Sequence, residues 1–204
     1  MPASALPDAA AAVERGGVVL YPTETVYGLG CDPRIEAAVD RIRRLKGRDA
    51  DKPMLAVTDR WGRVDGWVAG LTDGHRRLMA AVDGDGHPLA VTLLFSPGPD
   101  CPRALVGPGG LVGIRRTSDA VCRALVAACG TAILSTSANP AGEPPPSTFD
   151  AVDARILAGV DAAVDAGRPL QGTPSTVAKI EGDEVVVLRE GAVSAERVRQ
   201  VVRG

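Results

Sequence analysis

Six cationic residues lie within twelve positions of a chain that is acidic overall. The 204 residues include 23 Lys and Arg against 25 Asp and Glu, a formal net charge of −2. The positive charge of this segment is therefore local, and guanidinium and ammonium groups in such a cluster can bind the oxygens of a phosphate. The six residues are Arg41, Arg43, Arg44, Lys46, Arg48 and Lys52.

The cluster divides at Leu45. Apolar residues recur between positions 35 and 45 with the spacing of one helix face, so the three arginines before Leu45 either form the solvated face of that helix or join an anion site. The three cations after Leu45 flank Gly47 and Pro53. They are predicted to lie on a constrained turn that leads into a strand, where cations can converge on a phosphate.

Small hydroxyl and amide residues follow several predicted strands. They are Thr23 and Thr25, residues 135–139, and the pair Ser175-Thr176. In α/β sheets, ligands gather beyond the ends of strands, where such side chains meet phosphate and carboxylate oxygens. The same residue types also form turns and helix caps. Their occurrence together with the cations favours a site for an anionic ligand.

Several common catalytic signatures are missing from the sequence. No P-loop pattern occurs, and Gly28-Leu29-Gly30 lacks the third glycine of a dinucleotide fingerprint because Pro33 stands in its place. His75 and His87 lie in contexts typical of packing or surface histidines, so no serine hydrolase triad is predicted. The cysteines form no Cys-x-x-Cys pair and are interpreted as structural thiols, so no metal site of protein side chains is predicted. They are Cys31, Cys101, Cys122 and Cys129.

Strands and helices must alternate to position these residues. An N-terminal helix is expected to end at Gly16-Gly17, and another helix to begin at Pro33 with Asp32 as its N-cap. Ser147-Thr148-Phe149-Asp150 has the pattern of a capping box that opens a third helix. Further helices are predicted over 75–82 and 120–129. Strands are predicted over 18–21, 54–57, 90–95, 111–114, 131–134, 175–180 and 184–188, the last two joined by a Gly-Asp turn.

These elements predict one α/β domain over residues 1–204, with a twisted mixed sheet and flanking helices. The proline-rich segment 140–146 is expected to run over the surface without dividing the chain. No apolar run approaches the roughly 20 residues of a membrane span, and the N-terminus lacks the cationic region of a secretory signal. A soluble, cytoplasmic protein without membrane contact is the expectation.

Five motifs together carry a resemblance to a known family. They are residues 21–30 (YPTETVYGLG), Leu45-Lys46-Gly47-Arg48 with Lys52-Pro53, Ser137-Ala138-Asn139 with Gly142, Ser175-Thr176-Val177, and Leu188-Arg189-Glu190-Gly191. In order and spacing they resemble the YrdC-like threonylcarbamoyl-AMP synthase family, from about residue 16 to 194. The chain resembles the short form of the family, without an extra C-terminal domain.

The resemblance implies a sheet around a positively charged cavity. In the implied reaction the amine of L-threonine is carboxylated by bicarbonate, and the carbamate attacks the α-phosphorus of ATP and displaces pyrophosphate. Mg²⁺ on the ATP phosphates is expected. No protein nucleophile is needed, so positioning and electrostatic stabilisation would be the protein's contributions. The product would pass to a threonylcarbamoyl transfer machinery for tRNA modification, with tRNA contact indirect.

The resemblance also assigns roles to residues. The catalytic residues would be Lys46 and Arg48. The ATP-binding residues would be Arg48, Lys52, Ser137, Asn139, Ser147 and Arg189. The threonine-binding residues would be Thr25, Arg115 and Ser175. Arg115 suits this role because its planar fork can grip a carboxylate with two parallel hydrogen bonds.

Three departures from the family pattern lie in loops around the expected cavity. Residues 89–91 replace a usual Pro-Gly-Pro, Arg116-Thr117 replace an apolar residue and proline, and Ala141 replaces a frequent serine. A YciO-like paralogue with another substrate is therefore an alternative. An RNA-binding module is a second, but no aromatic residue lies within the cationic segment to stack on bases.

Overall fold

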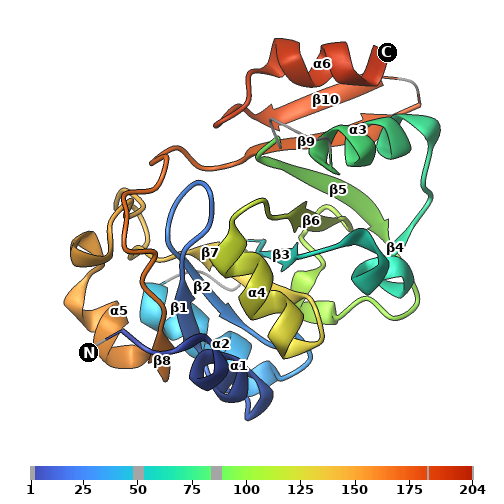
Figure 1. Cartoon of the computed structure of the whole chain (residues 1–204). Coiled ribbons are helices and arrows are strands. Elements are labelled where there is room, and N and C mark those ends of the chain that lie inside the picture. The colour runs from blue at the N-terminus through green and yellow to red at the C-terminus, as the bar shows by residue number, and fades with distance from the viewer. Residues whose placement is uncertain (1–2, 48–52, 84–88, 183, 204) are drawn as a thin grey trace.

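The computed structural model describes residues 3–47, 53–83, 89–182 and 184–203. Its strands are β1 (Val19–Tyr21), β2 (Gly28–Cys31), β3 (Leu55–Thr58), β4 (Val68–Ala69), β5 (Val91–Pro97), β6 (Val112–Arg116), β7 (Ile133–Ser137), β8 (Ala162–Ala163), β9 (Thr176–Glu181) and β10 (Glu184–Arg189). They form one sheet in the order β10-β9-β5-β6-β3-β7-β2-β1-β8, with β4 paired to β5 (Figure 1). The sheet contains both parallel and antiparallel pairs, so the predicted mixed sheet is confirmed.

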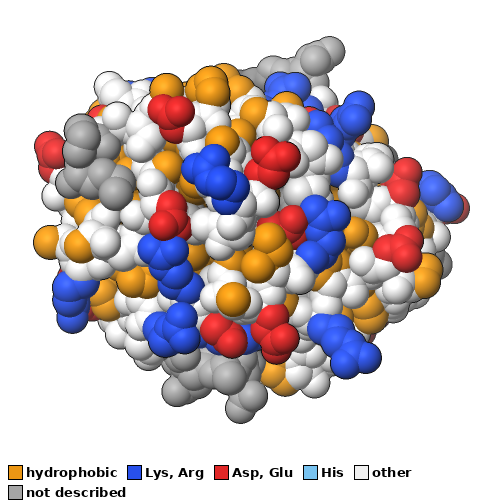
Figure 2. Space-filling view, turned by 90° about the horizontal axis from the view of Figure 1, so that it is seen from below, with side chains coloured by type: hydrophobic (Ala, Val, Ile, Leu, Met, Phe, Trp, Pro, Cys, Tyr) orange, Lys and Arg blue, Asp and Glu red, His pale blue; other side chains and the backbone are white. Residues whose placement is uncertain are grey.

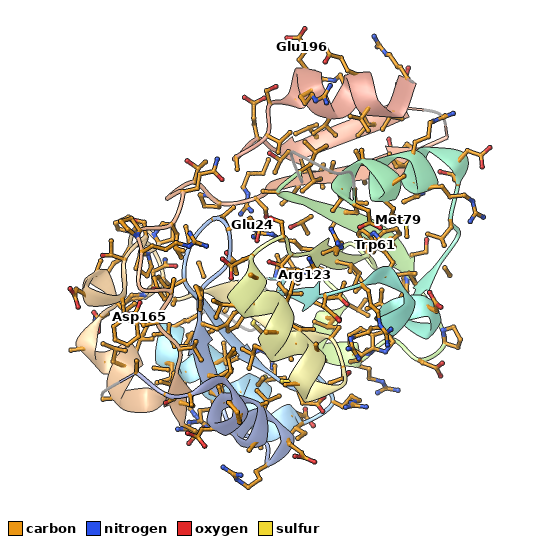
Figure 3. The ribbon with its side chains drawn as sticks, viewed as in Figure 1. Glu24, Trp61, Met79, Arg123, Asp165 and Glu196 are labelled. Carbon is orange, nitrogen blue, oxygen red and sulfur yellow. The ribbon has the colours of Figure 1, made fainter. Side chains whose placement is uncertain are left out.

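Helices cover the two ends and the middle of this sheet. The α-helices are α1 (Leu6–Glu14), α2 (Glu36–Lys46), α3 (Asp73–Asp83), α4 (Ala120–Cys129), α5 (Ala154–Gly159) and α6 (Ala195–Arg203), and the 3-10 helices are η1 (Trp61–Trp67), η2 (Arg103–Leu105) and η3 (Phe149–Ala151). Helices α3 and α6 pack together beside β9 and β10, and α1 packs on α4. Glu196 on α6 and Asp165 after β8 mark opposite ends of the molecule (Figure 3).

The core lies along the central strands, whose apolar side chains are buried on both faces. Fully buried residues include Leu93 and Phe95 of β5, Ile114 of β6 and Leu134 of β7. Burial of such side chains is the main force that holds a sheet of non-local pairings together. On the face seen in Figure 2, by contrast, Lys and Arg side chains are interspersed with Asp and Glu.

The predicted start of the second helix is wrong. Helix α2 begins at Glu36, not at Pro33. The carboxylate of Asp32 accepts hydrogen bonds from the backbone and side chain of Arg34, both at 2.9 Å, so it closes a local turn. The N-cap position is Ile35, in extended conformation and without a side-chain cap. Asp32 is an Asx-turn residue here, a common alternative to helix capping.

The predicted capping box at residues 147–150 is also wrong. Only the short 3-10 turn η3 follows it, and its N-cap residue Thr148 makes no side-chain capping bond. The α-helix begins later, at Ala154, because Asp153 caps it by accepting a hydrogen bond from the backbone N–H of Arg155 at 2.7 Å. Of the proline-rich segment predicted to run over the surface, residues 141–144 are exposed, whereas Pro140 and Pro145 are half-buried and Pro146 is buried.

Strand β2 was not predicted, because two of its four residues are glycines. The structure gives a reason for Gly30: a Cβ there would lie 2.7 Å from the ring of Tyr21 and 2.9 Å from the carbonyl oxygen of Leu134. The neighbouring strands β1 and β7 thus leave no room for a side chain. The apolar alternation that identifies a strand is lost for a packing reason.

The predicted packing role of His75 is confirmed. Its ring is buried and stacks on Phe95 with centroids 5.0 Å apart, and burial lowers its pKa. His87 lies outside the described residues. All four cysteines are free, and Cys31 and Cys122 are buried.

The longest helices described, α2 and α3, have 11 residues each. None of the helices in the described ranges combines the length and apolar character that a membrane crossing requires.

Candidate active site

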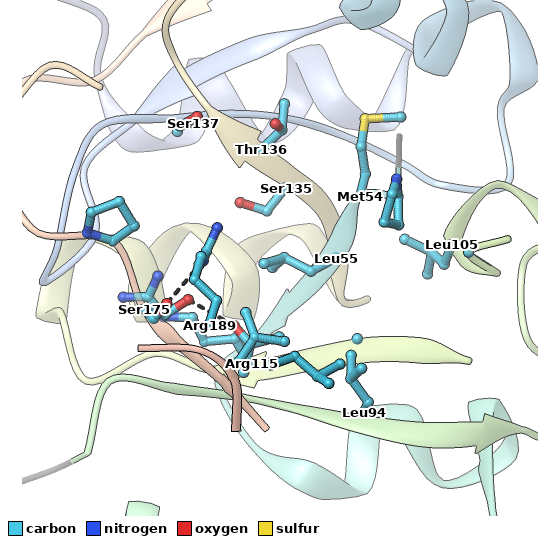
Figure 4. Close-up of a pocket in the computed structure, with 18 of the residues that line it drawn as sticks. Met54, Leu55, Leu94, Leu105, Arg115, Ser135, Thr136, Ser137, Ser175 and Arg189 are labelled. Carbon is cyan, nitrogen blue, oxygen red and sulfur yellow. Dashed lines mark hydrogen bonds between the residues drawn. The ribbon is translucent and has the colours of Figure 1, made fainter. Parts of the chain in front are cut away.

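A cavity of about 600 Å³ opens where β5, β6, β7 and β9 meet the loop after β1 (Figure 4). Its polar lining comes from six separate parts of the chain: the loop after β1, β5, β6, β7, the segment from Ser175 into β9, and the end of β10. The described charged residues that line it are Arg115, Lys179 and Arg189, and no acidic residue is among the described lining residues. The cavity therefore suits an anionic ligand.

Arg115 lies on β6 with only 5% of its surface exposed. Its Nη2 donates to the hydroxyl oxygen of Thr25 at 2.8 Å. Both Nε, at 3.2 Å, and Nη2, at 2.8 Å, contact Oε1 of Glu24. Arg115 was expected to bind a ligand carboxylate with two hydrogen bonds. Glu24 already occupies some of the donors that this binding would use. Of the three nitrogens, only Nη1 has no hydrogen-bond partner among the described residues, so it is the one left for a ligand.

The hydroxyl of Thr25 lies among several hydrogen-bonding groups. Thr23 donates its own hydroxyl proton to the carbonyl oxygen of Val26 at 2.7 Å, and its oxygen accepts from the backbone N–H groups of Thr25 and Val26, both at 3.2 Å. The two threonine hydroxyl oxygens are 3.0 Å apart. Because Thr25 also accepts from Arg115, one lone pair of its oxygen remains. It can accept a hydrogen bond from a ligand amine or hydroxyl.

Ser175 lies just before β9 and is buried. Its hydroxyl is 2.8 Å from that of Thr92 on β5, whose strand pairs with β9. Its carbonyl oxygen accepts from Nη2 of Arg189 at 2.8 Å (Figure 4). Partial burial, and after it the charge of Arg115, lower the pKa of Arg189. The two guanidinium groups thus repel one another, a repulsion that an anion between them would relieve.

The structure corrects the expected place of Lys46. It is the last residue of α2, not part of the following turn, and only 3% of its surface is exposed. Its ammonium donates to the carbonyl oxygens of Ser137 and Asn139, the latter at 2.6 Å. Lys46 is not among the described lining residues. The Lys46 ammonium therefore contacts the backbone at the end of β7 and just after it, and acts on the cavity through that segment.

The predicted ATP-binding residues separate into groups. Ser137 and Arg189 line the cavity, whereas Asn139 and Ser147 are not among the described lining residues. The Asn139 amide donates to the carbonyls of Pro140 at 2.9 Å and Glu143 at 2.6 Å, while its buried Oδ1 has no hydrogen-bond partner among the described residues. Arg48 and Lys52 lie outside the described residues, and their roles stay predictions.

Four residues of this site were missed by the sequence analysis as functional candidates: Glu24, Thr92, Thr117 and Lys179. Glu24 stood inside a quoted motif and Thr117 in a noted departure, but nothing in the sequence shows that their side chains meet. Lys179 had a usable signal, since it alternates with buried Ala178 on β9 and so shares a face with Val177.

No cluster of three or more His, Cys, Asp or Glu side chains that could hold a metal ion occurs in the part of the chain that the structure describes. The polar side chains that line the cavity carry hydroxyl and cationic groups. They do not form a carboxylate or imidazole set of the kind that holds a resident metal.

The comparisons with known proteins give the family. The model of the Sua5/YciO/YrdC family, described as "Telomere recombination", matches residues 11–191. The chain belongs to this family, as its motifs indicated. A relative from Thiobacillus denitrificans named threonylcarbamoyl-AMP synthase is 42% identical over 164 residues, which cover 80% of this chain and 84% of that protein. A relative of the same name from Stenotrophomonas maltophilia is 37% identical over 173 residues, or 83% of this chain and 91% of that one.

Solved structures of the family share the fold. Sua5 of P. abyssi complexed with L-threonine superposes with a TM-score of 0.87 at 28% identity, covering 96% of this chain and 56% of that one. The chain thus spans little more than half of that protein. E. coli YciO superposes with a TM-score of 0.81 at 26% identity, covering 94% of this chain and 91% of that one.

Proposed function

We propose that this chain is an enzyme that makes threonylcarbamoyl-AMP and pyrophosphate from L-threonine, bicarbonate and ATP. The observation that carries the proposal is the convergence of Thr25, Arg115 and Ser175 on one cavity from three distant parts of the chain. The relatives named threonylcarbamoyl-AMP synthase and the threonine complex of P. abyssi Sua5 support the same activity.

The reaction comprises two steps. The amine nitrogen of threonine forms a bond to the carbon of bicarbonate, and water leaves. An oxygen of the resulting carbamate then forms a bond to the α-phosphorus of ATP, while the bond from that phosphorus to the β-phosphate bridging oxygen breaks and pyrophosphate leaves. The protein needs no nucleophile. It contributes by holding two anionic partners together and by stabilising the charge on the phosphorus oxygens.

The threonine half of the site follows from the hydrogen-bond directions. Nη1 of Arg115 donates to the substrate carboxylate. The hydroxyl oxygen of Thr25 accepts a hydrogen bond from the substrate amine or hydroxyl. The Ser175 hydroxyl, which is hydrogen-bonded to Thr92, completes the polar lining around the substrate. A small amino acid with a side-chain hydroxyl satisfies these groups, whereas an apolar one leaves buried polar atoms unpaired.

The ATP half lies between the end of β7 and the end of β10. Ser137 and Arg189 line the cavity there. Arg48 and Lys52 are proposed to add the cations for the phosphates, and Asn139 and Ser147 to complete nucleotide binding. Lys46 and Arg48 are the proposed catalytic residues. Lys46 acts by holding the carbonyls of Ser137 and Asn139 and by adding a buried positive charge close to the phosphates.

Mg²⁺ is proposed as an ion that arrives on the ATP phosphates, which themselves supply the oxygen ligands it prefers. No step above depends on it. The product is proposed to pass to a threonylcarbamoyl transfer machinery in the cytoplasm, with tRNA reached indirectly.

One observation favours a second candidate. E. coli YciO matches this chain over 91% of its own length, so a paralogue with another substrate for the same cavity is the alternative. Pyrophosphate release from ATP distinguishes the two when threonine and bicarbonate are each omitted in turn. We expect release only in the complete mixture. Release that ignores threonine would favour the paralogue, and RNA binding without any turnover would favour the RNA-binding module.

A further inference from the structure

We propose that Glu24 and Thr117 are positioning residues that hold the guanidinium of Arg115 in the orientation that meets the substrate carboxylate. The inference rests on the proposed function, because it assumes that Arg115 binds that carboxylate. Neither residue is among the described residues that line the cavity, so both would act through Arg115. Glu24 lies on the loop after β1, in the middle of the molecule (Figure 3).

Glu24 is held from two sides. Oε1 accepts a hydrogen bond from Nε of Arg115 and forms an ion pair with Nη2, and Oε2 accepts from the hydroxyl of Thr117 at 2.7 Å. The side chain of Glu24 is 16% exposed and that of Arg115 is 6% exposed. A buried ion pair offsets the cost of its desolvation only when the remaining hydrogen-bond positions of both groups are satisfied. Thr117 supplies such a bond to the carboxylate oxygen that Arg115 does not contact.

Thr117 itself has little freedom to turn. The residue is fully buried, and its backbone N–H donates to the carbonyl oxygen of Thr58 at 3.0 Å. Its hydroxyl oxygen accepts from the backbone N–H of Asp119 at 3.2 Å. The hydroxyl proton is donated to Oε2 of Glu24, although the sulfur of the buried Cys122 also lies within hydrogen-bond reach of this hydroxyl.

The chain of contacts determines which nitrogen of Arg115 faces the substrate. With Glu24 on the Nε and Nη2 edge and Thr25 on Nη2, the guanidinium plane cannot rotate without breaking these bonds. Removal of the Thr117 hydroxyl frees one oxygen of Glu24, so the carboxylate and the guanidinium can turn together. Small misalignments of a ligand-binding group cost affinity even when the charge remains.

The test compares Thr117→Val, which keeps the shape but loses the hydroxyl, with Thr117→Ser, which keeps the hydroxyl. Steady-state pyrophosphate release gives KM and kcat for threonine and ATP, and calorimetric titration gives threonine affinity without turnover. We expect Thr117→Val to raise the KM for threonine about tenfold, the size of one hydrogen bond to a charged group. The KM for ATP should change less than about twofold, and Thr117→Ser should restore the wild-type value. Thr117→Val with an unchanged threonine KM, or Thr117→Ser as impaired as Thr117→Val, would overturn the inference.

Glu24→Gln provides a second test, which can be made even if Thr117→Val does not fold. We expect weaker threonine binding, because a neutral amide holds the guanidinium less firmly. Tighter binding would overturn the inference, since it would make Glu24 a competitor of the substrate for Arg115. A wild-type chain that neither binds threonine nor releases pyrophosphate would instead overturn the proposed function, and this inference with it.

Discussion

Single side chains in this cavity are specific because their hydrogen-bond directions are largely settled before a ligand arrives. Arg115 donates to the hydroxyl oxygen of Thr25, and Thr23 donates to the carbonyl oxygen of Val26, so Thr25 keeps one lone pair for a ligand. Sequence alone identified Thr25 and Arg115 as candidates, but not the contact between them. That contact joins residues 90 positions apart in the chain.

Discrimination between threonine and valine tests this arrangement. The two amino acids have nearly the same shape, but valine lacks the hydroxyl and leaves polar groups around Thr25 and Ser175 unpaired. We expect kcat/KM to favour threonine, by up to about 10⁴-fold. Competition between the two in pyrophosphate release provides the measurement. Equal kcat/KM for valine and threonine would mean that the site does not recognise the hydroxyl.

Lys46→Met tests the place of the buried ammonium. Methionine has a similar length but cannot donate, so the carbonyls of Ser137 and Asn139 lose their charged partner. We expect the free energy of unfolding to fall by about 2 kcal/mol or more, and the KM for ATP to rise. Urea denaturation measures the free energy of unfolding, and pyrophosphate release measures the KM for ATP.

Arg44→Ala, on the exposed side of the same helix, is the control and should change stability by less than about 0.5 kcal/mol. Full stability of Lys46→Met would contradict the assignment.

Elements with strong apolar periodicity were predictable, and those shaped by local contacts were not. Strands β3, β5, β6 and β7 and helices α3 and α4 lie close to their predicted positions. Strand β2 was missed because Gly30 must fit beneath the ring of Tyr21. The start of α2 was misplaced because Asp32 binds Arg34. In both cases, the deciding contact is one that helix and strand propensities do not include.

The approach of β10 to the segment before β9 gives an element-scale prediction. A Cβ at Gly191 would collide with the carbonyl oxygen of Pro174 and lie 2.7 Å from the backbone carbonyl of Ser175. Gly191→Ala must therefore push apart the segments that carry Ser175 and Arg189. We expect a loss of threonine affinity together with a loss of stability.

Gly182→Ala is the matched control for Gly191→Ala. Gly182 lies between β9 and β10 with φ +60° and no described atom near a Cβ. Alanine there costs about 1 kcal/mol of backbone strain but leaves the cavity alone. Equal threonine affinity in Gly191→Ala and wild type would show that this close contact does not shape the site.

At the scale of the molecule, the sheet order brings the site together. The parallel pairing of β5 with β9 and the antiparallel pairing of β5 with β6 place Ser175, Thr92 and Arg115 around one space. These pairings join segments far apart in the chain, so periodicity could predict the strands but not their neighbours. The family resemblance predicted a sheet around a cavity but no strand order, and the family model confirms the membership.

The buried pair of Glu24 and Arg115 predicts how stability responds to acid. Burial alone would raise the pKa of Glu24, but the charge of Arg115 and the hydrogen bonds from Thr117 and Arg115 lower it below its usual value of 4.5. A carboxylate with a lowered folded-state pKa contributes stability above about pH 4.5, and that contribution is lost as the pH falls through the folded-state pKa.

Wild type should therefore lose more stability than Glu24→Gln between about pH 6 and pH 3. Thermal or urea unfolding across this range measures the difference, and the exposed Glu196→Gln serves as the control for loss of a carboxylate. Parallel curves for wild type and Glu24→Gln would mean that the pair contributes nothing to acid stability.

The bond at which ATP is cleaved tests the central claim most directly. Incubation with ¹⁴C-bicarbonate, threonine and α-³²P-ATP, followed by chromatography, identifies the products. The account predicts pyrophosphate and one nucleotide that carries both labels, formed only when threonine and bicarbonate are both present. Formation of ADP with free phosphate, or an adenylate without the bicarbonate carbon, would contradict it.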